Sequence, residues 1–220
     1  MKIQSLGILG LGSRSTIFYI KELNRLYHQK KGGYSTCPFK LWNVNFDGLN
    51  NLLPETSEKL ETLVRKYLLE LQELNVDAIL IPNITLHETI DKLVDNQKII
   101  HPVHLTAEMI KEQGVKEIVL FGSLYMMESD YLKTAFNENI RVILPSKEER
   151  LFIDTVRKHI YWEIETKELI KKYTDLIEKY TTNYGVVLAC TELSVGWGGA
   201  NNKVFDMSRI QIEKAVENLK

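Results

Sequence analysis

The chain has 220 residues, of which 44% are hydrophobic and 26% are charged, a balance typical of a folded globular protein. Its length suits one or two compact domains, and no segment approaches the apolar length that crosses a bilayer. The formal net charge is −1, so we expect neither a nucleic acid nor a membrane surface as partner.

Apolar runs alternate with segments of helical periodicity along the whole chain. In chain order, we expect strands at residues 3–9, 39–46, 77–82, 99–103, 117–121, 140–144, 185–189 and 203–205. The helices expected between them cover residues 17–29, 55–74, 85–94, 106–113, the segment from the turn at 122–126 to about 136, 147–180 with a break near 165, and 208–219. This alternation predicts an α/β fold with a parallel sheet. Ligands of such sheets bind where the carboxyl ends of the strands meet.

The two halves of the chain resemble each other weakly. The run Leu80-Ile81-Pro82-Asn83 is similar to Val187-Leu188-Ala189-Cys190, about a hundred residues later. A duplicated half would account for this, and chance similarity between apolar strands is the alternative.

Only two cysteines are present, Cys37 and Cys190, too few for a disulfide framework. One disulfide is an open alternative, but a reduced cytoplasmic protein is the simpler interpretation. The apolar run at residues 3–11 is broken by glycines and lacks the features of a signal peptide.

Cys190 is the strongest candidate for chemistry. It follows an expected strand and precedes an expected helix, where free backbone N–H groups favour a thiolate and lower its pKa. Such a thiolate can remove a proton from carbon or attack an electrophile. The alternative is a small cysteine packed in the core, which is the interpretation we give Cys37.

Asn83 occupies the matching turn of the first half. Its amide can donate a hydrogen bond to a carboxylate or an oxyanion, although asparagine is also a common helix cap. His87, one helical turn later, could orient the site or could be a structural histidine. His101 and His104 have no cysteine or carboxylate cluster at ligand spacing, so we expect no metal site.

Several other polar residues fall in the expected strand-end turns. Hydroxyl groups at converging helix starts can form an anion site, although each hydroxyl alone is more ordinarily a helix cap. The candidates for binding a substrate are Ser13, Ser15, Thr16, Asn45, Thr85, Ser123, Thr191 and Glu192.

Together these motifs resemble the aspartate/glutamate racemases, which racemise amino acids without a cofactor. Cys190-Thr191-Glu192 is similar to the second catalytic cysteine motif of that family. The run from Pro82 to His87 resembles the first motif, whose usual form is Cys (or Thr)-Asn-Thr-x-His. Further similar stretches are Ser15-Thr16-Ile17, Gly122-Ser123-Leu124-Tyr125-Met126-Met127-Glu128 and Val204-Phe205-Asp206.

The resemblance implies two similar three-layer α/β domains with mainly parallel sheets, related by a pseudo-twofold duplication, and an active site in the cleft between them. The expected lobes are residues 1–100 with 205–220, and residues 101–204. The resemblance also implies a homodimer that uses neither pyridoxal phosphate nor a metal.

In the two-cysteine members, one thiolate removes the Cα proton and the opposite thiol returns one to the other face. Here Asn83 replaces the first cysteine and Ile84 replaces the following asparagine, so Cys190 is the one acid/base left. Three interpretations remain open. The protein is a racemase-like isomerase, or a related one-sided decarboxylase, acting on an acidic amino acid or similar small carboxylate. Alternatively, it is a silent homologue that binds such a carboxylate, or Cys190 is structural.

Overall fold

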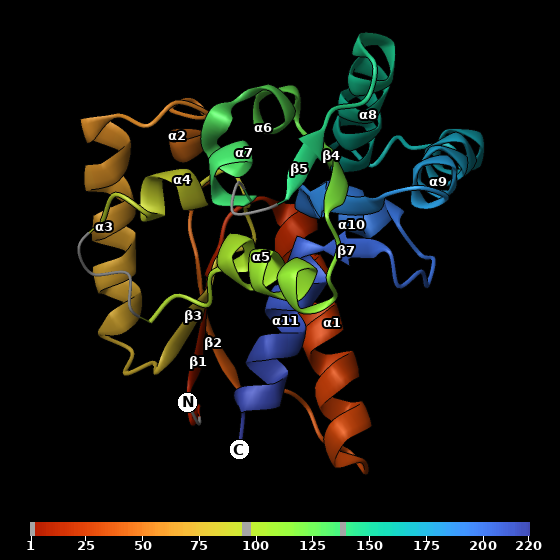
Figure 1. Ribbon diagram of the computed structural model, residues 1–220. Coiled ribbons are helices and arrows are strands. Elements are labelled where there is room, and N and C mark those ends of the chain that lie inside the picture. The colour runs from red at the N-terminus through yellow and green to blue at the C-terminus, as the bar shows by residue number, and fades with distance from the viewer. Residues whose placement is uncertain (1–2, 94–97, 137–139) are drawn as a thin grey trace. The chain divides into compact units, whose positions relative to one another are not determined.

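The computed structural model describes residues 3–93, 98–136 and 140–220, and the chain divides into two compact units (Figure 1). Unit 1 comprises Met1–His101 with Gln211–Lys220, and unit 2 comprises Pro102–Ile210. Each unit is an α/β structure built on a parallel sheet, as the alternation of strands and helices predicts.

The sheet of unit 1 has the strand order β2-β1-β3, with β1 (Leu6–Gly10), β2 (Phe39–Asn43) and β3 (Ala78–Leu80) all parallel. Its helices are α1 (Ser13–Lys31), α2 (Asp47–Asn50), α3 (Glu58–Gln72), α4 (His87–Ile90) and the greater part of α11 (Met207–Asn218). Figure 1 shows α3 on one side of these strands, and α1 with α11 on the other.

The core of unit 1 forms where the apolar stripe of α3 meets the sheet. Leu60, Val64, Leu68 and Leu71 recur at helical spacing on α3 and are buried in one cluster with Leu9 of β1. The N-cap residue Ser57, whose hydroxyl accepts from the Leu60 N–H, fixes the start of this helix.

The last residues of the chain complete unit 1. The Tyr19 hydroxyl on α1 hydrogen-bonds the side chain of Gln211 on α11 at 2.5 Å. The Lys30 ammonium donates to the carbonyl oxygens of Val216, Glu217 and Leu219 at the end of the same helix. These cross-links satisfy carbonyls that a helix C-terminus leaves without partners.

The sheet of unit 2 has the order β5-β4-β6-β7, again entirely parallel. Its strands are β4 (Glu117–Gly122), β5 (Arg141–Ile143), β6 (Gly185–Ala189) and β7 (Val204–Asp206). Its helices are α5 (Pro102–Glu112), α6 (Leu124–Glu128), α7 (Asp130–Phe136), α8 (Lys147–Tyr161), α9 (Lys167–Thr181) and α10 (Thr191–Gly196). Of these, α8 packs against β4 and α9 against β6, whereas α5 packs against β7.

The same strand order occurs in both units. The order β2-β1-β3 in unit 1 corresponds to β5-β4-β6 in unit 2, where β7 is added beside β6. In this correspondence β3 matches β6, so the turn that contains Asn83 matches the turn that contains Cys190. The common topology supports the weak internal repeat seen in the sequence.

Two expected elements are wrong. Residues 99–103 do not form a strand: Ile99 makes an isolated bridge to Ile79, and helix α5 begins at Pro102. Proline favours the first helical position because it lacks an N–H that would have no partner there. The single helix expected to end near residue 136 is two helices, α6 and α7, separated by Ser129 in an extended conformation.

Other boundaries shift. The first strand begins at Leu6, and Ile3 makes only an isolated bridge to Leu219. The helix expected at residues 85–94 is the short α4, and Val94 lies outside the described residues. The expected break near residue 165 is confirmed: α9 starts after the N-cap Thr166.

The return of the chain to unit 1 also lies later than the expected residue 205. Strand β7 is hydrogen-bonded to β6 through the pairs Val186–Val204, Val187–Phe205 and Leu188–Asp206, so it belongs to unit 2. The chain returns to unit 1 at Gln211.

Within the described part of the chain, no helix combines the length and the apolar character needed to span a membrane.

Asp206, at the end of β7, joins three elements of unit 2. Its buried carboxylate accepts hydrogen bonds from the Ser194 hydroxyl on α10 at 2.7 Å and from the backbone N–H groups of Ser208 and Arg209 at 3.1 Å. It also forms an ion pair with the Arg209 guanidinium. The Ser208 hydroxyl lies 3.2 Å from that of Thr191, so this network fixes the start of α10.

We therefore predict that Asp206→Ala destabilises the protein by about 3–5 kcal/mol, because it leaves a partly buried cation and several buried donors without this acceptor. Urea unfolding followed by far-ultraviolet circular dichroism measures this loss. The control is Asp175→Ala, which removes an exposed carboxylate paired with Lys171 and should change stability by less than about 0.5 kcal/mol. A loss of less than about 1 kcal/mol for Asp206→Ala would contradict this role.

Candidate functional site

The register of unit 2 places two candidate residues next to each other. Gly122 of β4 pairs with Ala189 of β6, and each is the last residue of its strand. Ser123 and Cys190 follow at the same level of the sheet. Each is an N-cap residue: Ser123 for α6, with its hydroxyl accepting from the Met126 N–H, and Cys190 for α10.

The thiol of Cys190 donates a hydrogen bond to a carboxylate oxygen of Glu192, with the sulfur 2.9 Å from Oε2. Burial raises the pKa of Cys190 well above its ordinary value, and the charge of Glu192 raises it further, whereas the Arg157 guanidinium acts in the opposite direction. The expected lowering of this pKa is therefore wrong. The helix that follows Cys190 has only six residues, and its dipole does not overcome burial and the adjacent carboxylate.

Arg157 on α8 was not among the residues expected at the site. Burial lowers the pKa of its guanidinium, but interactions with Cys190, Asp154 and Glu192 raise it by more. Its Nε donates to Asp154 Oδ1 at 3.0 Å, and this bond fixes the direction of the guanidinium.

Asp154 acts as the support for Arg157. It is buried, and burial alone would favour its protonated form, but Lys158 and Arg157 lower its pKa so that it stays ionised. Lys158 Nζ lies 2.7 Å from Asp154 Oδ2. The sequence contained one signal for this group: Asp154 lies on the buried stripe of α8 with Ile153, Val156 and Ile160, where an unpaired carboxylate would be costly.

Thr191 has a structural role in this geometry. It is buried, and its hydroxyl is held by Ser208 in the network of Asp206. Tyr173 of α9 lies behind the turn and donates from its hydroxyl to the carbonyl oxygen of Leu193 at 3.1 Å. The segment that follows Cys190 is thus fixed by buried hydrogen bonds.

In unit 1, Asn83 follows β3 and makes a local turn. Its side-chain oxygen accepts from the Leu86 N–H at 2.9 Å, which assigns the orientation of the amide. The amide N–H₂ group is then directed away from that bond and is available as a donor. Both interpretations of Asn83 are compatible with this geometry, since one oxygen caps the turn while the other end of the amide can bind an oxyanion.

His87 lies beneath this turn and is fully buried. Its Nδ1 is 2.8 Å from the carbonyl oxygen of Asn83, which assigns Nδ1 as the protonated nitrogen. Burial, with a smaller contribution from the neighbouring His101, lowers the pKa of His87 to about 3, so the ring is neutral near pH 7. His87 therefore orients Asn83 through the backbone.

Asp91 extends this group. The rings of His87 and His101 meet edge to face, with centroids 4.7 Å apart, and His101 Nε2 lies 3.2 Å from Asp91 Oδ1. A carboxylate thus does lie close to one of the histidines, which the spacing in the sequence did not indicate.

The hydroxyls after β1 are used within their own turn. Ser15 donates to the Gly12 carbonyl oxygen at 3.0 Å, and Thr16 accepts from the Leu11 N–H at 3.1 Å. Both side chains are buried, whereas Ser13 is exposed at the start of α1. Ser15 and Thr16 stabilise the turn, and Ser13 is the member of the three whose side chain solvent can reach.

Asn45 and Thr85 follow the other two strands of unit 1. Asn45 is exposed, and its side-chain oxygen accepts from the Asp47 N–H at 3.2 Å. Thr85 is partly buried, directly after Ile84. Because all three strands are parallel, the turns that carry Ser13, Asn45, Asn83 and Thr85 occur at the same edge of the sheet.

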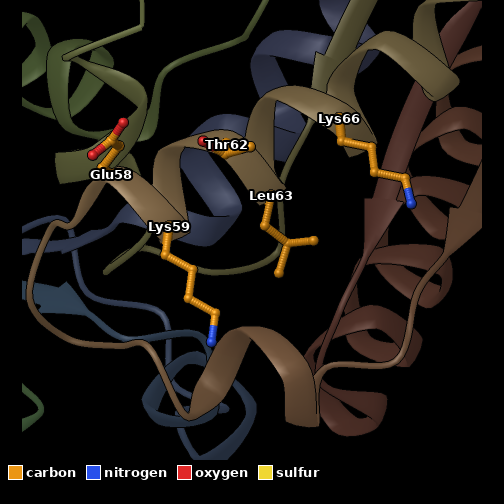
Figure 2. A pocket seen from close by; sticks show the side chains of 5 residues that line it. All are labelled: Glu58, Lys59, Thr62, Leu63 and Lys66. Atoms are coloured by element: carbon orange, nitrogen blue, oxygen red, sulfur yellow. The ribbon is translucent and has the colours of Figure 1, made fainter.

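A shallow hollow of about 470 Å³ lies elsewhere in unit 1. Figure 2 shows its lining, which comes from α3: Glu58, Lys59, Thr62, Leu63 and Lys66. None of the candidate residues belongs to it. Flexible side chains of one helix form its wall, so we do not assign the chemistry to this hollow.

The fold and the site define a two-unit parallel α/β protein with a cysteine at a strand end. No protein-family model matches the chain. Among solved structures, a candidate Asp/Glu racemase from Yersinia pestis superposes with a TM-score of 0.82 at 24% identity, covering 97% of this chain and 98% of the other.

An aspartate racemase homologue from Pyrococcus horikoshii gives a TM-score of 0.80 at 24% identity, over 97% of this chain and 98% of the other. The aspartate racemase of Picrophilus torridus gives 0.75 at 17% identity, over 97% and 94%. The chain therefore has the fold of the aspartate/glutamate racemase homologues, as its motifs led us to expect.

The burial of His87 predicts a specific acid sensitivity. Its pKa is about 3 in the folded protein against an ordinary value of 6.5, so the unfolded chain binds the proton more readily. The contribution of His87 to stability is thus fully present above pH 6.5 and is lost as the pH falls towards 3. By pH 5 the loss amounts to about 2 kcal/mol.

We expect His87→Gln to reduce the fall in unfolding free energy between pH 7 and pH 5 by about that amount, whatever its effect at pH 7. Urea titrations at the two pH values measure the difference, and His28→Gln, at an exposed position of α1, should retain the wild-type fall. An equal fall in wild type and His87→Gln would show that His87 is not held neutral by burial.

Proposed function

We propose that the protein catalyses cofactor-independent proton transfer at Cα of an acidic amino acid or a similar small carboxylate, as a racemase-like isomerase. Cys190 is the group that exchanges the proton. Three structural neighbours support this choice: an aspartate racemase, a candidate Asp/Glu racemase and an aspartate racemase homologue.

One observation carries the proposal: the thiol at the end of β6 and the Arg157 guanidinium on α8 each shift the pKa of the other. Arg157 is held by Asp154 through Nε, which leaves the other guanidinium nitrogens to bind a carboxylate. A carboxylate bound there would bring its Cα close to the sulfur of Cys190. The guanidinium would also stabilise the negative charge that develops on the substrate when the Cα–H bond breaks.

The opposite face is assigned to Asn83. We infer that Asn83 serves the opposite face of the substrate, because β3 and β6 hold the same place in the two sheets and Asn83 stands where the family has its first acid/base. Asn83 does not exchange protons near pH 7, but its amide N–H₂ can hold the substrate or a water molecule. Exposed Ser13, Asn45 and partly buried Thr85 and Ser123 are further donors for the substrate's polar groups.

A second candidate function is binding without turnover. It is favoured by two observations: an amide stands where the family has its first acid/base, and the pKa of Cys190 is raised. A one-sided decarboxylation or isomerisation needs one proton donor only, so it is also compatible with a single cysteine.

We further place the protein in the reducing cytoplasm as a homodimer. Both cysteines are free. Leu41 and Trp42 are partly exposed on β2, an edge strand of the unit 1 sheet, where a second copy could cover them.

The central prediction is that Cys190 is required for hydrogen exchange at Cα. In D₂O, the wild-type protein should exchange the Cα proton of D- or L-aspartate or glutamate, followed by proton NMR. Cys190→Ala should slow this exchange by at least about 100-fold, because it removes the group that gives and takes the Cα proton.

Cys37→Ser is the matched control, since Cys37 lies buried in unit 1 and should not affect exchange. Exchange that persists in Cys190→Ala would exclude the cysteine as the acid/base. If the wild-type protein exchanges nothing, a rise in melting temperature with the same ligands would identify a binding protein.

A second prediction tests whether Asn83 and Cys190 serve the same substrate. In a Cys37→Ser background, Asn83→Cys creates a thiol that should be joined to Cys190 by a short bifunctional alkylating agent at about pH 9. The bridged peptides are identified by mass spectrometry. Lys66→Cys in the same background gives an exposed thiol on α3 that should not be bridged. If the agent bridges Cys190 to both variants equally, or to neither of them, the result would argue against a joint role of Asn83 and Cys190.

A further inference from the structure

The sulfur of Cys190 has a carboxylate as its hydrogen-bond acceptor. Glu192 is two residues further along and partly buried in the first turn of α10, and its Oε2 lies 2.9 Å from Sγ. Ionisation of the thiol would place two negative charges at this distance in a site with little water. The contact is therefore favourable for the thiol and unfavourable for the thiolate.

The other charged and titratable groups that act on this sulfur come from two helices. Arg157 of α8 favours the thiolate, but its charge is shared with Asp154, to which its Nε is bonded. The Tyr173 hydroxyl of α9 is buried and engaged by the Leu193 carbonyl, so it is a neutral neighbour. Among the described residues, Glu192 thus favours the thiol form of Cys190, whereas Arg157 favours the thiolate. Burial also favours the thiol.

We propose that Glu192 is a positioning residue that keeps Cys190 as a neutral thiol, so that Cys190 first meets a substrate as a proton donor. In that step the S–H bond breaks, the proton passes to the substrate carbanion, and the sulfur becomes a thiolate. Water then returns a proton to sulfur, and the Glu192 hydrogen bond forms again. This role of donor rests on the one-sided decarboxylation or isomerisation proposed above, in which Cys190 is needed only as a donor, whereas the protonation state itself does not.

A cysteine that is protonated before the reaction differs in its chemistry from a cysteine that is already a thiolate. The protonated form favours a reaction in which the carbanion arises without a base on the Cys190 face. Loss of carbon dioxide from a small dicarboxylate is such a reaction: the C–C bond breaks, its electron pair stays on Cα, and Cys190 supplies the proton.

The test is the pH dependence of Cys190 alkylation by iodoacetamide, followed on the Cys190 peptide by mass spectrometry so that Cys37 does not interfere. In the native protein, half-maximal reactivity should lie above the range of an ordinary thiol, about pH 8.5. Glu192→Gln keeps the shape of the side chain and removes its charge. It should move the profile to lower pH and accelerate alkylation at about pH 7.5 by tenfold or more, since a thiol that is mostly protonated gains tenfold in thiolate per pH unit.

Glu168→Gln is the control, because it removes an exposed carboxylate that is paired with Lys172 on α9, and it should leave the profile unchanged. If circular dichroism shows that Glu192→Gln does not fold, the titration of the native protein and of Glu192→Asp test the proposal instead. The shorter carboxylate of Glu192→Asp should move the alkylation profile to lower pH by a smaller amount than Glu192→Gln would. A native profile at or below that of an ordinary thiol, or a Glu192 variant that reacts no faster than wild type, overturns the proposal. No substrate is needed, so failure here is distinct from a failure to exchange Cα hydrogen.

Discussion

The parallel pairing of β6 with its neighbours is the constraint on which the site depends. Because β4, β6 and β7 run in the same direction and in register, their last residues fall at one edge, and the side chains that follow them must converge. Ser123, Cys190 and Asp206 owe their proximity to this register. A shift by one residue would turn Cys190 to the other face of the sheet.

Much of the fold followed from the sequence because the periodic signals were strong. The buried run of β6 and the apolar stripe of α3 are patterns that local chemistry produces by itself. The strand predicted at residues 99–103 was wrong, because an apolar run interrupted by Pro102 fits a short strand as well as a helix start. Which of these forms depends on the bridge from Ile99 to Ile79, a contact distant in sequence.

The candidate site likewise contains residues that the sequence indicated and one that it did not. Cys190 and Asn83 were found because they follow apolar strands in similar motifs. Arg157 was missed because helix α9 and strand β6 separate it from Cys190 in the sequence, and only the packing of α8 against its neighbours lets the guanidinium act on the thiol. The sign of the Cys190 pKa shift was wrong because a rule about helix ends was applied without the depth of the sulfur or the carboxylate beside it.

The discontinuity of unit 1 has a consequence for biosynthesis. Lys30 and Tyr19 find their partners on α11, so the first hundred residues leave the ribosome without the segment that completes their core. Translation at about 5–20 residues per second means a delay on the order of ten seconds while unit 2 is made. During that interval the hydrogen bonds that join α1 to α11 cannot form, so the nascent unit 1 is held by its own sheet and helices alone.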